Sequence, residues 1–422
     1  MHYISTRNST IKHALSTAIL TGLAPDGGLY VPEYLPFIKY EKIDSSVPFA
    51  EFVAQILSLY FKNDKLNSFL NLICEQALNF EVPLKPINQN TFLLELFHGP
   101  TLSFKDFGAR FLAECLAQIS NRRPLTIMVA TSGDTGSAVA SAFDGKDNIK
   151  VIILYPKGQV SKRQEHQMTC WGENILALAV EGDFDTCQKL VKTAFEDQWW
   201  KKNHQLTSSN SINIARLLPQ ISYYAYTSSQ FFQSHGKKPG FIVPTGNLGN
   251  ATAAYWAKMM GFPIRDIVLS TNANRTIVNY LETGNYQAQP SISTLANAMD
   301  VGNPSNFERL SYLFHNPELF KNNVKAISVS DQQITQTIKE VYSNNNLIIC
   351  PHTATAYFAR KQLSSDEPWI VVSTADPSKF DSIIEPIIGA PLTVNSQLQQ
   401  LLDKPTQKLI VGPSLIEIQK YL

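Results

Sequence analysis

The sequence HGPTLSFKDFG, from His98 to Gly108, decides how the rest of the chain is interpreted, because it holds a lysine where a charged side chain is costly. Apolar residues recur at spacings of three and four from Phe104 to Ile119, which predicts an amphipathic helix. On a helical projection Lys105 lies in line with Leu112 and Leu116. Two explanations for this lysine are open: its head extends to the surface, or it forms an imine with an aldehyde such as pyridoxal phosphate. The segment alone favours the first.

The other polar residues of this helix are expected on a different side. Asp106, Arg110 and Glu114 follow one another at intervals of four, which predicts a solvated face with i,i+4 ion pairs.

Length and composition indicate a globular protein of more than one domain. The chain has 422 residues, of which 44% are hydrophobic and 17% charged. A formal charge of +1 without a run of like charges gives no nucleic-acid footprint. The beginning of the chain lacks the apolar core of a signal peptide, and no apolar segment is long enough to span a membrane. The five scattered cysteines argue against a disulfide frame or a metal site. We therefore expect a cytoplasmic protein.

From Thr91 onward, predicted strands and helices alternate. The strand patterns cover residues 91–96, 126–130, 151–155, 175–180, 241–243, 267–270, 326–329 and 369–372, each followed by a helical or loop pattern. This alternation predicts an α/β protein with largely parallel sheets that are covered by helices. Ligands then bind beyond the carboxyl ends of the strands.

Two loops that follow predicted strands suit an anion. TSGDTG, from Thr131 to Gly136, presents backbone N–H groups and hydroxyls at a helix start, although a capped helix with small residues explains it equally well. PTGNLGN, from Pro244 to Asn250, is neither a Walker loop nor G-x-G-x-x-G. Its glycines allow the backbone to turn N–H groups toward a phosphate, and a plain glycine turn is the alternative.

Two further segments carry polar groups at helix starts. NSINIAR, from Asn210 to Arg216, places amides, a hydroxyl and a guanidinium within two turns, and a solvated helix start capped by Asn210 or Ser211 is the alternative. Thr374 ends a buried strand and can hydrogen-bond a ring nitrogen. Asp376 before Pro377 predicts a helix N-cap. One site that binds pyridoxal phosphate and an anionic substrate accounts for all four segments together with Lys105.

The motifs HGPT-x-SFKDFG, TSGDTG, NS-x-N-x-x-R and GN-x-GN, with GLAPDGGLYVP at Gly22 to Pro32, resemble the threonine synthase family. The resemblance extends to about Phe380. It implies the fold of the tryptophan-synthase-β-like, fold-type-II pyridoxal-phosphate enzymes. That fold has two open, twisted, largely parallel sheet domains with helices on both faces. We place these domains at 91–240 and 241–422, after an N-terminal extension at 1–90.

The resemblance also implies roles for individual residues. Lys105 would carry the Schiff base and act as general acid and base. The cofactor phosphate would be held by Gly246, Asn247, Leu248, Gly249 and Asn250, and the pyridine nitrogen would face Thr374. The substrate carboxylate or the cofactor edge would contact Ser132, Gly133, Asp134 and Thr135. The substrate phosphate would bind Asn210, Ser211 and Arg216. One departure is Asp376, where the family often has histidine.

The implied reaction converts O-phospho-L-homoserine and water into L-threonine and phosphate, in a monomer or small homo-oligomer. The nearest alternative is a threonine or serine dehydratase of the same fold type, for which the three phosphate-binding residues would be idle. A non-catalytic binding protein and a nucleotide-binding protein are the remaining alternatives.

Overall fold

Two largely parallel sheets form the framework of the protein, seen here in a computed structural model that describes residues 1–119, 124–131, 133–364 and 366–422. The larger sheet has the strand order β11-β10-β9-β12-β4-β3. Its strands are β3 (Leu84–Asn88), β4 (Thr91–Glu95), β9 (Gly240–Pro244), β10 (Ile267–Thr271), β11 (Lys325–Ser328) and β12 (Trp369–Ser373). Only β3 is antiparallel to its neighbour.

The smaller sheet is parallel throughout and has the order β13-β7-β6-β5-β8. Its strands are β5 (Leu125–Ala130), β6 (Ile149–Pro156), β7 (Ile175–Val180), β8 (Gln205–Thr207) and β13 (Leu409–Val411). A separate antiparallel pair is formed by β1 (Tyr3–Ser5) and β2 (Tyr30–Pro32). The α/β fold with parallel, helix-covered sheets is confirmed.

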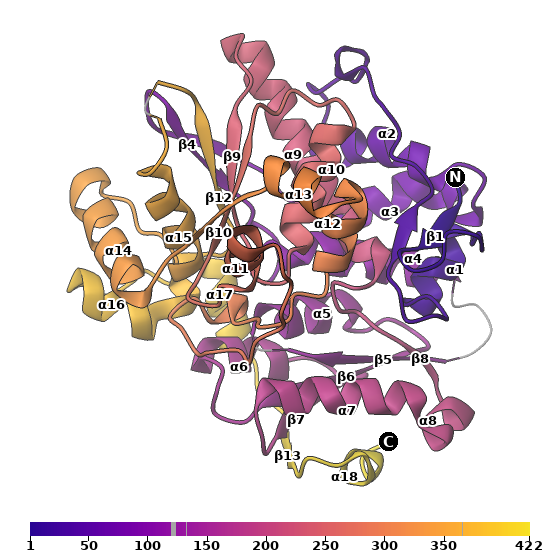
Figure 1. Ribbon diagram of the computed structural model, residues 1–422. Coiled ribbons are helices and arrows are strands. Elements are labelled where there is room, and N and C mark those ends of the chain that lie inside the picture. The colour runs from indigo at the N-terminus through magenta and orange to yellow at the C-terminus, as the bar shows by residue number, and fades with distance from the viewer. Residues whose placement is uncertain (120–123, 132, 365) are drawn as a thin grey trace.

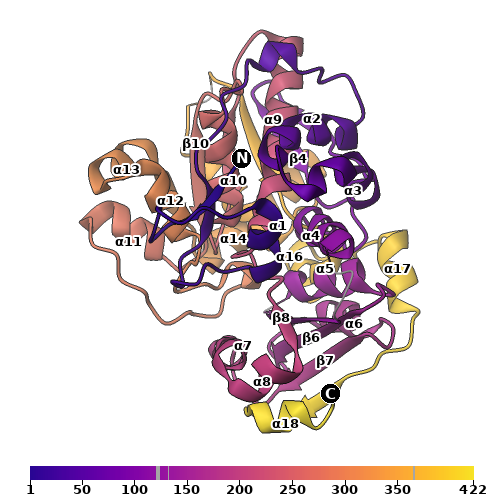
Figure 2. The same ribbon diagram turned by 90° about the vertical axis from the view of Figure 1, so that its right-hand side faces the viewer.

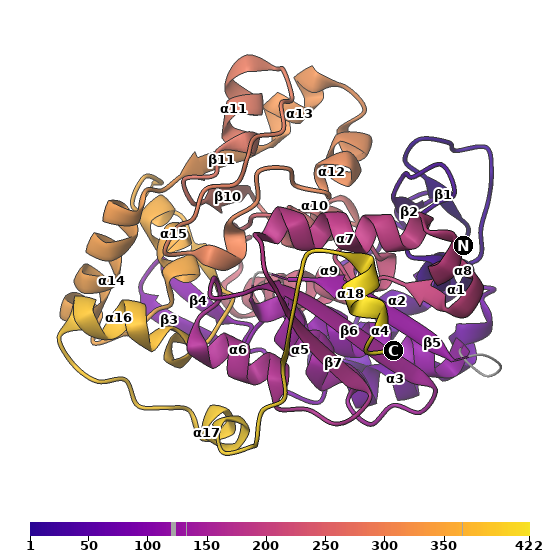
Figure 3. The same cartoon turned by 90° about the horizontal axis from the view of Figure 1, so that it is seen from below.

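Alternate residues of the larger sheet enter two different cores, as a strand period of two requires. Phe92 and Leu94 join the core under α9 (Ile214–His235) and α10 (Gly249–Met259). Leu93, between them, joins the core under α14 (Asp331–Asn345), α15 (Pro351–Arg360) and α16 (Asp381–Ile388). Figure 1 shows these helix groups on opposite sides of the sheet. Figure 3 shows α11 (Thr276–Thr283), α12 (Phe307–Phe314) and α13 (Pro317–Asn323) on the side of β10 and β11.

The smaller sheet is sandwiched in the same way. One face packs against α4 (Lys105–Ile119), α5 (Asp134–Phe143) and α6 (Lys162–Thr169). The other face packs against α7 (Phe184–Glu196), α8 (Gln198–Asn203) and α18 (Leu415–Gln419), as Figure 3 shows. Asp183 is the N-cap of α7, because its carboxylate accepts from the Thr186 N–H at 2.8 Å.

The two sheets do not follow the boundaries predicted at residues 90 and 240. Strand β4 pairs with β12, so residues 91–95 belong to the larger sheet. At the other end of the chain, α17 (Ser396–Leu402) leads to β13, which pairs with β7 of the smaller sheet. The apolar pattern of a strand predicts that it is buried but does not identify the strand it pairs with. For that reason the predicted domain boundaries do not match the division into two sheets.

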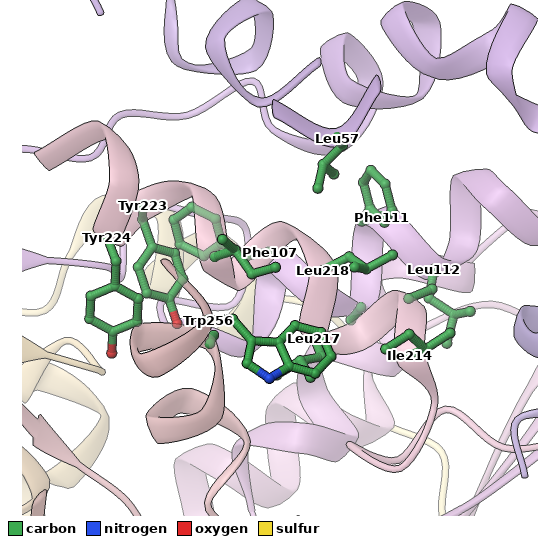
Figure 4. Close-up of a cluster of buried hydrophobic side chains, with 14 of the residues drawn as sticks. Leu57, Phe107, Phe111, Leu112, Ile214, Leu217, Leu218, Tyr223, Tyr224 and Trp256 are labelled. Atoms are coloured by element: carbon green, nitrogen blue, oxygen red, sulfur yellow. The ribbon is translucent and has the colours of Figure 1, made fainter. Parts of the chain in front are cut away.

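Helix α4 lies at the centre of the molecule. It packs against α9 and against the N-terminal helices α1 (Leu15–Thr21), α2 (Phe49–Phe61) and α3 (Leu70–Ala77) (Figure 2). Figure 4 shows Phe107, Phe111 and Leu112 of α4 among Leu217 and Leu218 of α9. A lysine that begins this helix is therefore fixed by packing on several sides.

The predicted solvated face of α4 is wrong. Asp106 is fully buried, and Arg110 donates to the Ala77 carbonyl oxygen at 2.7 Å instead of pairing with acidic neighbours. Glu114 is buried and forms its ion pair with Lys146 at 2.8 Å. Helix α3 covers α4 around Arg110, and Asp106 accepts hydrogen bonds from Thr101; a pattern confined to one helix reveals neither contact.

The close approach of α4 and α9 generates a test at Gly108. A Cβ atom there would lie 2.6 Å from the Arg216 carbonyl oxygen, closer than real contacts allow. Helix propensity alone predicts that Gly108→Ala stabilises the protein by about 1 kcal/mol. We expect the packing conflict to prevail and the free energy of unfolding to fall by about 1–3 kcal/mol in urea denaturation. Ser58→Ala at an exposed position of α2 is the control and should change it by less than about 0.5 kcal/mol.

Candidate active site

The carboxyl ends of three neighbouring strands bring the predicted site segments together. Strands β4, β12 and β9 are adjacent and parallel. The Lys105 segment follows β4, Thr374 follows β12, and the GNLGN loop follows β9. Because these strands end at one edge of the sheet, segments distant in the sequence meet there.

Backbone hydrogen bonds join the Lys105 segment to the segment around Thr374. The Phe104 N–H donates to the Thr374 carbonyl oxygen at 2.9 Å. The Asp376 N–H donates to the Leu102 carbonyl oxygen at 3.1 Å. Lys105 is the first residue of α4, so its position relative to Thr374 is set by main-chain contacts.

Lys105 is half-buried at the wall of a cavity of about 960 Å³. No carboxylate among the described residues forms an ion pair with its amine, which lies 4.6 Å from the centre of the Phe104 ring. Burial, together with the positive charge of Arg216, lowers the pKa of Lys105 to about 8, against the opposing effect of Asp134. The positive end of α4 also disfavours an ammonium at this position. Lys105 therefore combines access to the cavity with an amine that is readily deprotonated.

A buried ion pair that no pattern in the sequence predicts joins three segments of the site. The Lys379 ammonium is fully buried, 2.7 Å from Asp134 Oδ1 and 2.7 Å from the Thr101 carbonyl oxygen. Burial raises the pKa of Asp134, but Lys379, His352 and the hydrogen bond from Gln164 together outweigh burial and keep that pKa low. Lys379 lies in a 3₁₀ turn from Pro377 to Phe380, which is capped by Asp376 as predicted. The turn has no helical period from which the burial of Lys379 could be read.

The TSGDTG loop is held by the hydroxyl of its first residue. Thr131 Oγ1 accepts from the N–H groups of Gly133 and Gly136 at 3.1 and 3.0 Å. Gly133 has a φ of 155°, and a Cβ there would lie 2.7 Å from Gln164 Nε2, so glycine is required. Thr135 lines the cavity, whereas Asp134 is turned to its ion pair and does not. The predicted ligand Ser132 lies outside the described residues.

The GNLGN loop has the geometry of an anion cradle. Leu248 adopts the left-handed conformation, with a φ of 60°, and caps α10. Gly246 lies against the backbone of Met299, where a Cβ would be 2.7 Å from the Met299 Cα. The first N–H groups of α10, from Gly249 onward, are left for a ligand by helix geometry.

Two asparagines fix this loop. The Asn250 carboxamide oxygen accepts from the hydroxyls of Tyr223 and Tyr224, each at 2.6 Å. Its buried Nδ2 has no partner within the part of the chain that the structure describes. Asn247 lines the cavity and donates to Ser211 Oγ at 2.6 Å, so the loop is joined to the NSINIAR segment.

Only some residues of the NSINIAR segment line the cavity. Asn210 and Ser211 line it, whereas Arg216 lies behind the wall with 2% of its surface exposed. The helix begins at Ile214 with Asn213 as N-cap, so the alternative of a helix start capped by Asn210 or Ser211 is wrong. Burial lowers the pKa of Arg216 to about 10, and Asp106 opposes this. Arg216 Nε has no hydrogen-bond partner among the described side chains and backbone atoms.

The N-terminal region also lines the cavity, which the sequence did not indicate. Thr6, Arg7 and Gly27 form part of the wall. Arg7 makes two hydrogen bonds of 3.0 Å to the Glu308 carboxylate of α12.

The described residues contain no group of three or more histidine, cysteine or acidic side chains arranged for a metal ion. No helix in the described ranges is long and apolar enough to cross a bilayer.

Comparison with known proteins identifies the family. Residues 80–375 match the model of pyridoxal-phosphate dependent enzymes, and residues 2–78 match the threonine synthase N terminus. A threonine synthase of Haemophilus influenzae is 41% identical over 403 residues, or 94% of each chain. This chain belongs to the threonine synthase family.

Solved structures of the threonine synthase family agree over the whole chain. The Escherichia coli enzyme has a TM-score of 0.91 and 36% identity, with 100% of this chain and 99% of that chain covered. Threonine synthase of Brucella melitensis with bound pyridoxal phosphate has a TM-score of 0.93 and 33% identity, with 100% and 98% covered. The fold type and the expected cofactor, pyridoxal phosphate, are thereby confirmed.

The residues of this chain fit that cofactor. Three features suit an aldehyde that carries a phosphate: an amine without a carboxylate partner among the described residues, the first N–H groups of α10, which have no intrahelical partner, and the unpartnered Asn250 Nδ2. Thr374 follows β12, the strand that lies between β4, which precedes Lys105, and β9, which precedes the GNLGN loop.

The environment of Lys105 predicts a pH dependence. Covalent attachment of added pyridoxal phosphate to the apoenzyme needs the neutral amine, so its rate should rise with pH around a midpoint near 8 instead of 10.5. Arg216→Met removes a charge that lowers this pKa, and the midpoint should move upward in absorbance-monitored kinetics. Arg360→Met is the control, because Arg360 is also buried but donates to Thr91 Oγ1 at the opposite end of β4. An unchanged midpoint in Arg216→Met would contradict the electrostatic explanation.

Proposed function

We propose that the chain converts O-phospho-L-homoserine and water into L-threonine and phosphate. The observation that carries this proposal is the shared cavity: Lys105, Thr135, Asn210, Ser211 and Asn247 all line it, although they come from four separate segments. One amine that can exchange protons and a set of polar groups for an anion thus face the same ligand space. Pyridoxal phosphate, when bound, supplies the electron sink that makes protons beside the amino group acidic.

Lys105 is proposed to hold the cofactor covalently and to move protons at the α- and β-carbons of the substrate. Proton transfer in both directions is efficient when the pKa of the catalytic group lies near the working pH. Burial and the positive charge of Arg216 bring the pKa of Lys105 to about 8, close to that condition. The apolar helix α4 behind Lys105 excludes water from one side of the amine.

The cofactor phosphate is proposed to bind Gly246, Asn247, Leu248, Gly249 and Asn250, with Thr374 at the ring nitrogen. Thr374 offers a neutral hydroxyl, which orients the ring through a hydrogen bond without supplying a positive charge. Asp376 is engaged in capping through Ser378, at 2.8 Å, so its carboxylate is held by the turn.

The substrate phosphate is proposed to bind Asn210 and Ser211, with Arg216 behind them. Asn210 and Ser211 are the members of this set that line the cavity. Arg216 adds a positive charge close to the wall and has an N–H group at Nε with no partner among the described residues. Ser132, Gly133, Asp134 and Thr135 are proposed to lie at the carboxylate or the cofactor edge, with Thr135 the one in the cavity wall.

The proposal is tested by assaying phosphate and L-threonine release from O-phospho-L-homoserine. Lys105→Ala should lose at least about 10³-fold in kcat, because it removes the group that moves the protons. Borohydride reduction of the holoenzyme followed by peptide mapping should place the pyridoxyl label on Lys105. Lys146→Ala, which breaks an ion pair with Glu114 away from the cavity wall, is the control and should keep its activity.

Two outcomes would contradict the proposal. A label on another lysine would refute the site, and release of a 2-oxo acid from L-threonine or L-serine as the main activity would indicate a dehydratase. In a dehydratase, Arg216→Ala should leave the KM for L-threonine or L-serine unchanged. In a synthase, the same substitution should weaken binding of O-phospho-L-homoserine.

A further inference from the structure

Arg309 of α12 is a fully buried guanidinium whose hydrogen bonds reach three parts of the chain. Nε donates to the Tyr30 carbonyl oxygen at 3.0 Å, next to the N-terminal strand pair. Nη1 donates to the Ser211 carbonyl oxygen at 3.0 Å, and Nη2 donates to the Ile212 carbonyl oxygen at 2.5 Å. Nη1 also donates to Asn306 Oδ1 at 2.7 Å.

These acceptors are uncharged, so the positive charge of Arg309 is not compensated by an ion pair within the described ranges. The nearest acidic residue in the chain, Glu308, is engaged by Arg7 and by the hydroxyl of Thr6. Burial lowers the pKa of Arg309 to about 9, against the influence of Glu308, and the group stays protonated at neutral pH. A buried charge without a counter-ion is costly, and an anion that binds nearby offsets that cost.

The hydrogen bonds of Arg309 also determine what Ser211 offers to the cavity. Because Arg309 can only donate, its bond to Asn306 Oδ1 turns the Asn306 amide so that Nδ2 donates to Ser211 Oγ at 3.2 Å. Asn247 is oriented in the same way, since its Oδ1 accepts from the Ser305 N–H and its Nδ2 donates to Ser211 Oγ at 2.6 Å. Ser211 Oγ thus accepts two hydrogen bonds. Its own hydrogen is left to donate to a ligand in the cavity that Ser211 lines.

We infer that Arg309 is a positioning residue for the anion subsite: it makes the Ser211 hydroxyl a hydrogen-bond donor toward the substrate phosphate and supplies an uncompensated positive charge behind it. This inference rests on the proposed function and deepens it. An arginine is needed because its planar fork reaches three carbonyl oxygens and one amide oxygen at once. A lysine carries its donors on one atom and cannot reach the Tyr30 and Ile212 carbonyl oxygens together.

The experiment compares Arg309→Gln and Arg309→Lys in holoenzyme saturated with pyridoxal phosphate. The first variant removes the charge and keeps some donors, and the second keeps the charge and loses the fork. The control is Arg360→Gln, because Arg360 is also buried and also donates to carbonyl oxygens, those of Leu363 and Ser364. It lies beside Thr91, at the end of β4 remote from Lys105.

For Arg309→Gln we expect KM for O-phospho-L-homoserine and the inhibition constant of inorganic phosphate to rise together by about 10- to 100-fold, while kcat changes less than about threefold. Arg309→Lys should show a smaller rise in both constants. Arg360→Gln should lower the melting temperature and leave both constants within twofold of wild type.

The inference is overturned if the Arg309 variants and Arg360→Gln change KM and the phosphate inhibition constant equally, because Arg309 would then serve stability alone. If Arg309→Gln does not fold, the same comparison is made with Arg309→Lys. Thermal stabilisation of the holoenzyme by inorganic phosphate is measured in parallel and needs no turnover. Phosphate binding that depends on Arg309 in an enzyme inactive toward O-phospho-L-homoserine would refute the proposed function and support the role of Arg309.

Discussion

The arrangement of the site depends on an ammonium and a carboxylate that are both removed from water. Lys379 joins Asp134 and the Thr101 carbonyl oxygen, which belong to three segments more than thirty residues apart. A buried ion pair is weak evidence for stability, because the loss of hydration offsets much of the attraction. Removing one partner is costly, at about 3–5 kcal/mol, since the other charge is then buried alone. The pair therefore restricts the segments to arrangements in which both charges meet, and this fixes the start of α4 relative to the TSGDTG loop.

Charge around the cavity is unbalanced in favour of cations. Among the described residues, the buried or half-buried cations there are Lys105, Arg216, Arg309 and Lys379. The buried or half-buried carboxylates close to them are Asp106, Asp134 and Glu308, and Glu308 is already paired with Arg7. Such an excess destabilises the empty protein and favours ligands that carry negative charge. Binding of a phosphate-bearing cofactor then stabilises the folded state by more than its contacts alone contribute, because it neutralises charges that are already buried. The same imbalance lowers the pKa of Lys105, so the affinity for anions and the reactivity of the amine have a common origin.

The N-terminal region completes this site and does not merely precede it. Helix α3 covers α4 around Arg110, whose guanidinium donates to the Ala77 carbonyl oxygen. The Tyr30 carbonyl oxygen accepts from Arg309, and Arg7 holds Glu308 of the same helix. Arg7 and Tyr30, both in the first third of the N-terminal segment, thus hold α12 against the NSINIAR segment.

The sequence predicted the parts of the structure that depend on local order along the chain. Strands such as β6 and β9, and the loops that follow β5 and β9, are visible as apolar runs that end in glycine and polar residues. The position of Lys105 beside these loops followed from the rule that ligands bind at the carboxyl ends of parallel strands. The pairing of β4 with β12 had no local signal, because each strand has an apolar centre, is buried along its whole length and fits any central position.

The burial of a charged residue such as Arg309 could not be predicted from this one sequence. Arg309 follows Glu308 in a short helix, and adjacent opposite charges usually indicate an exposed pair. In the structure the two side chains diverge, Glu308 toward Arg7 and Arg309 toward main-chain oxygen atoms of distant segments. Main-chain acceptors are present at almost every position and leave no mark in the sequence. A buried arginine that binds them therefore looks like a surface arginine until the fold brings those segments around it.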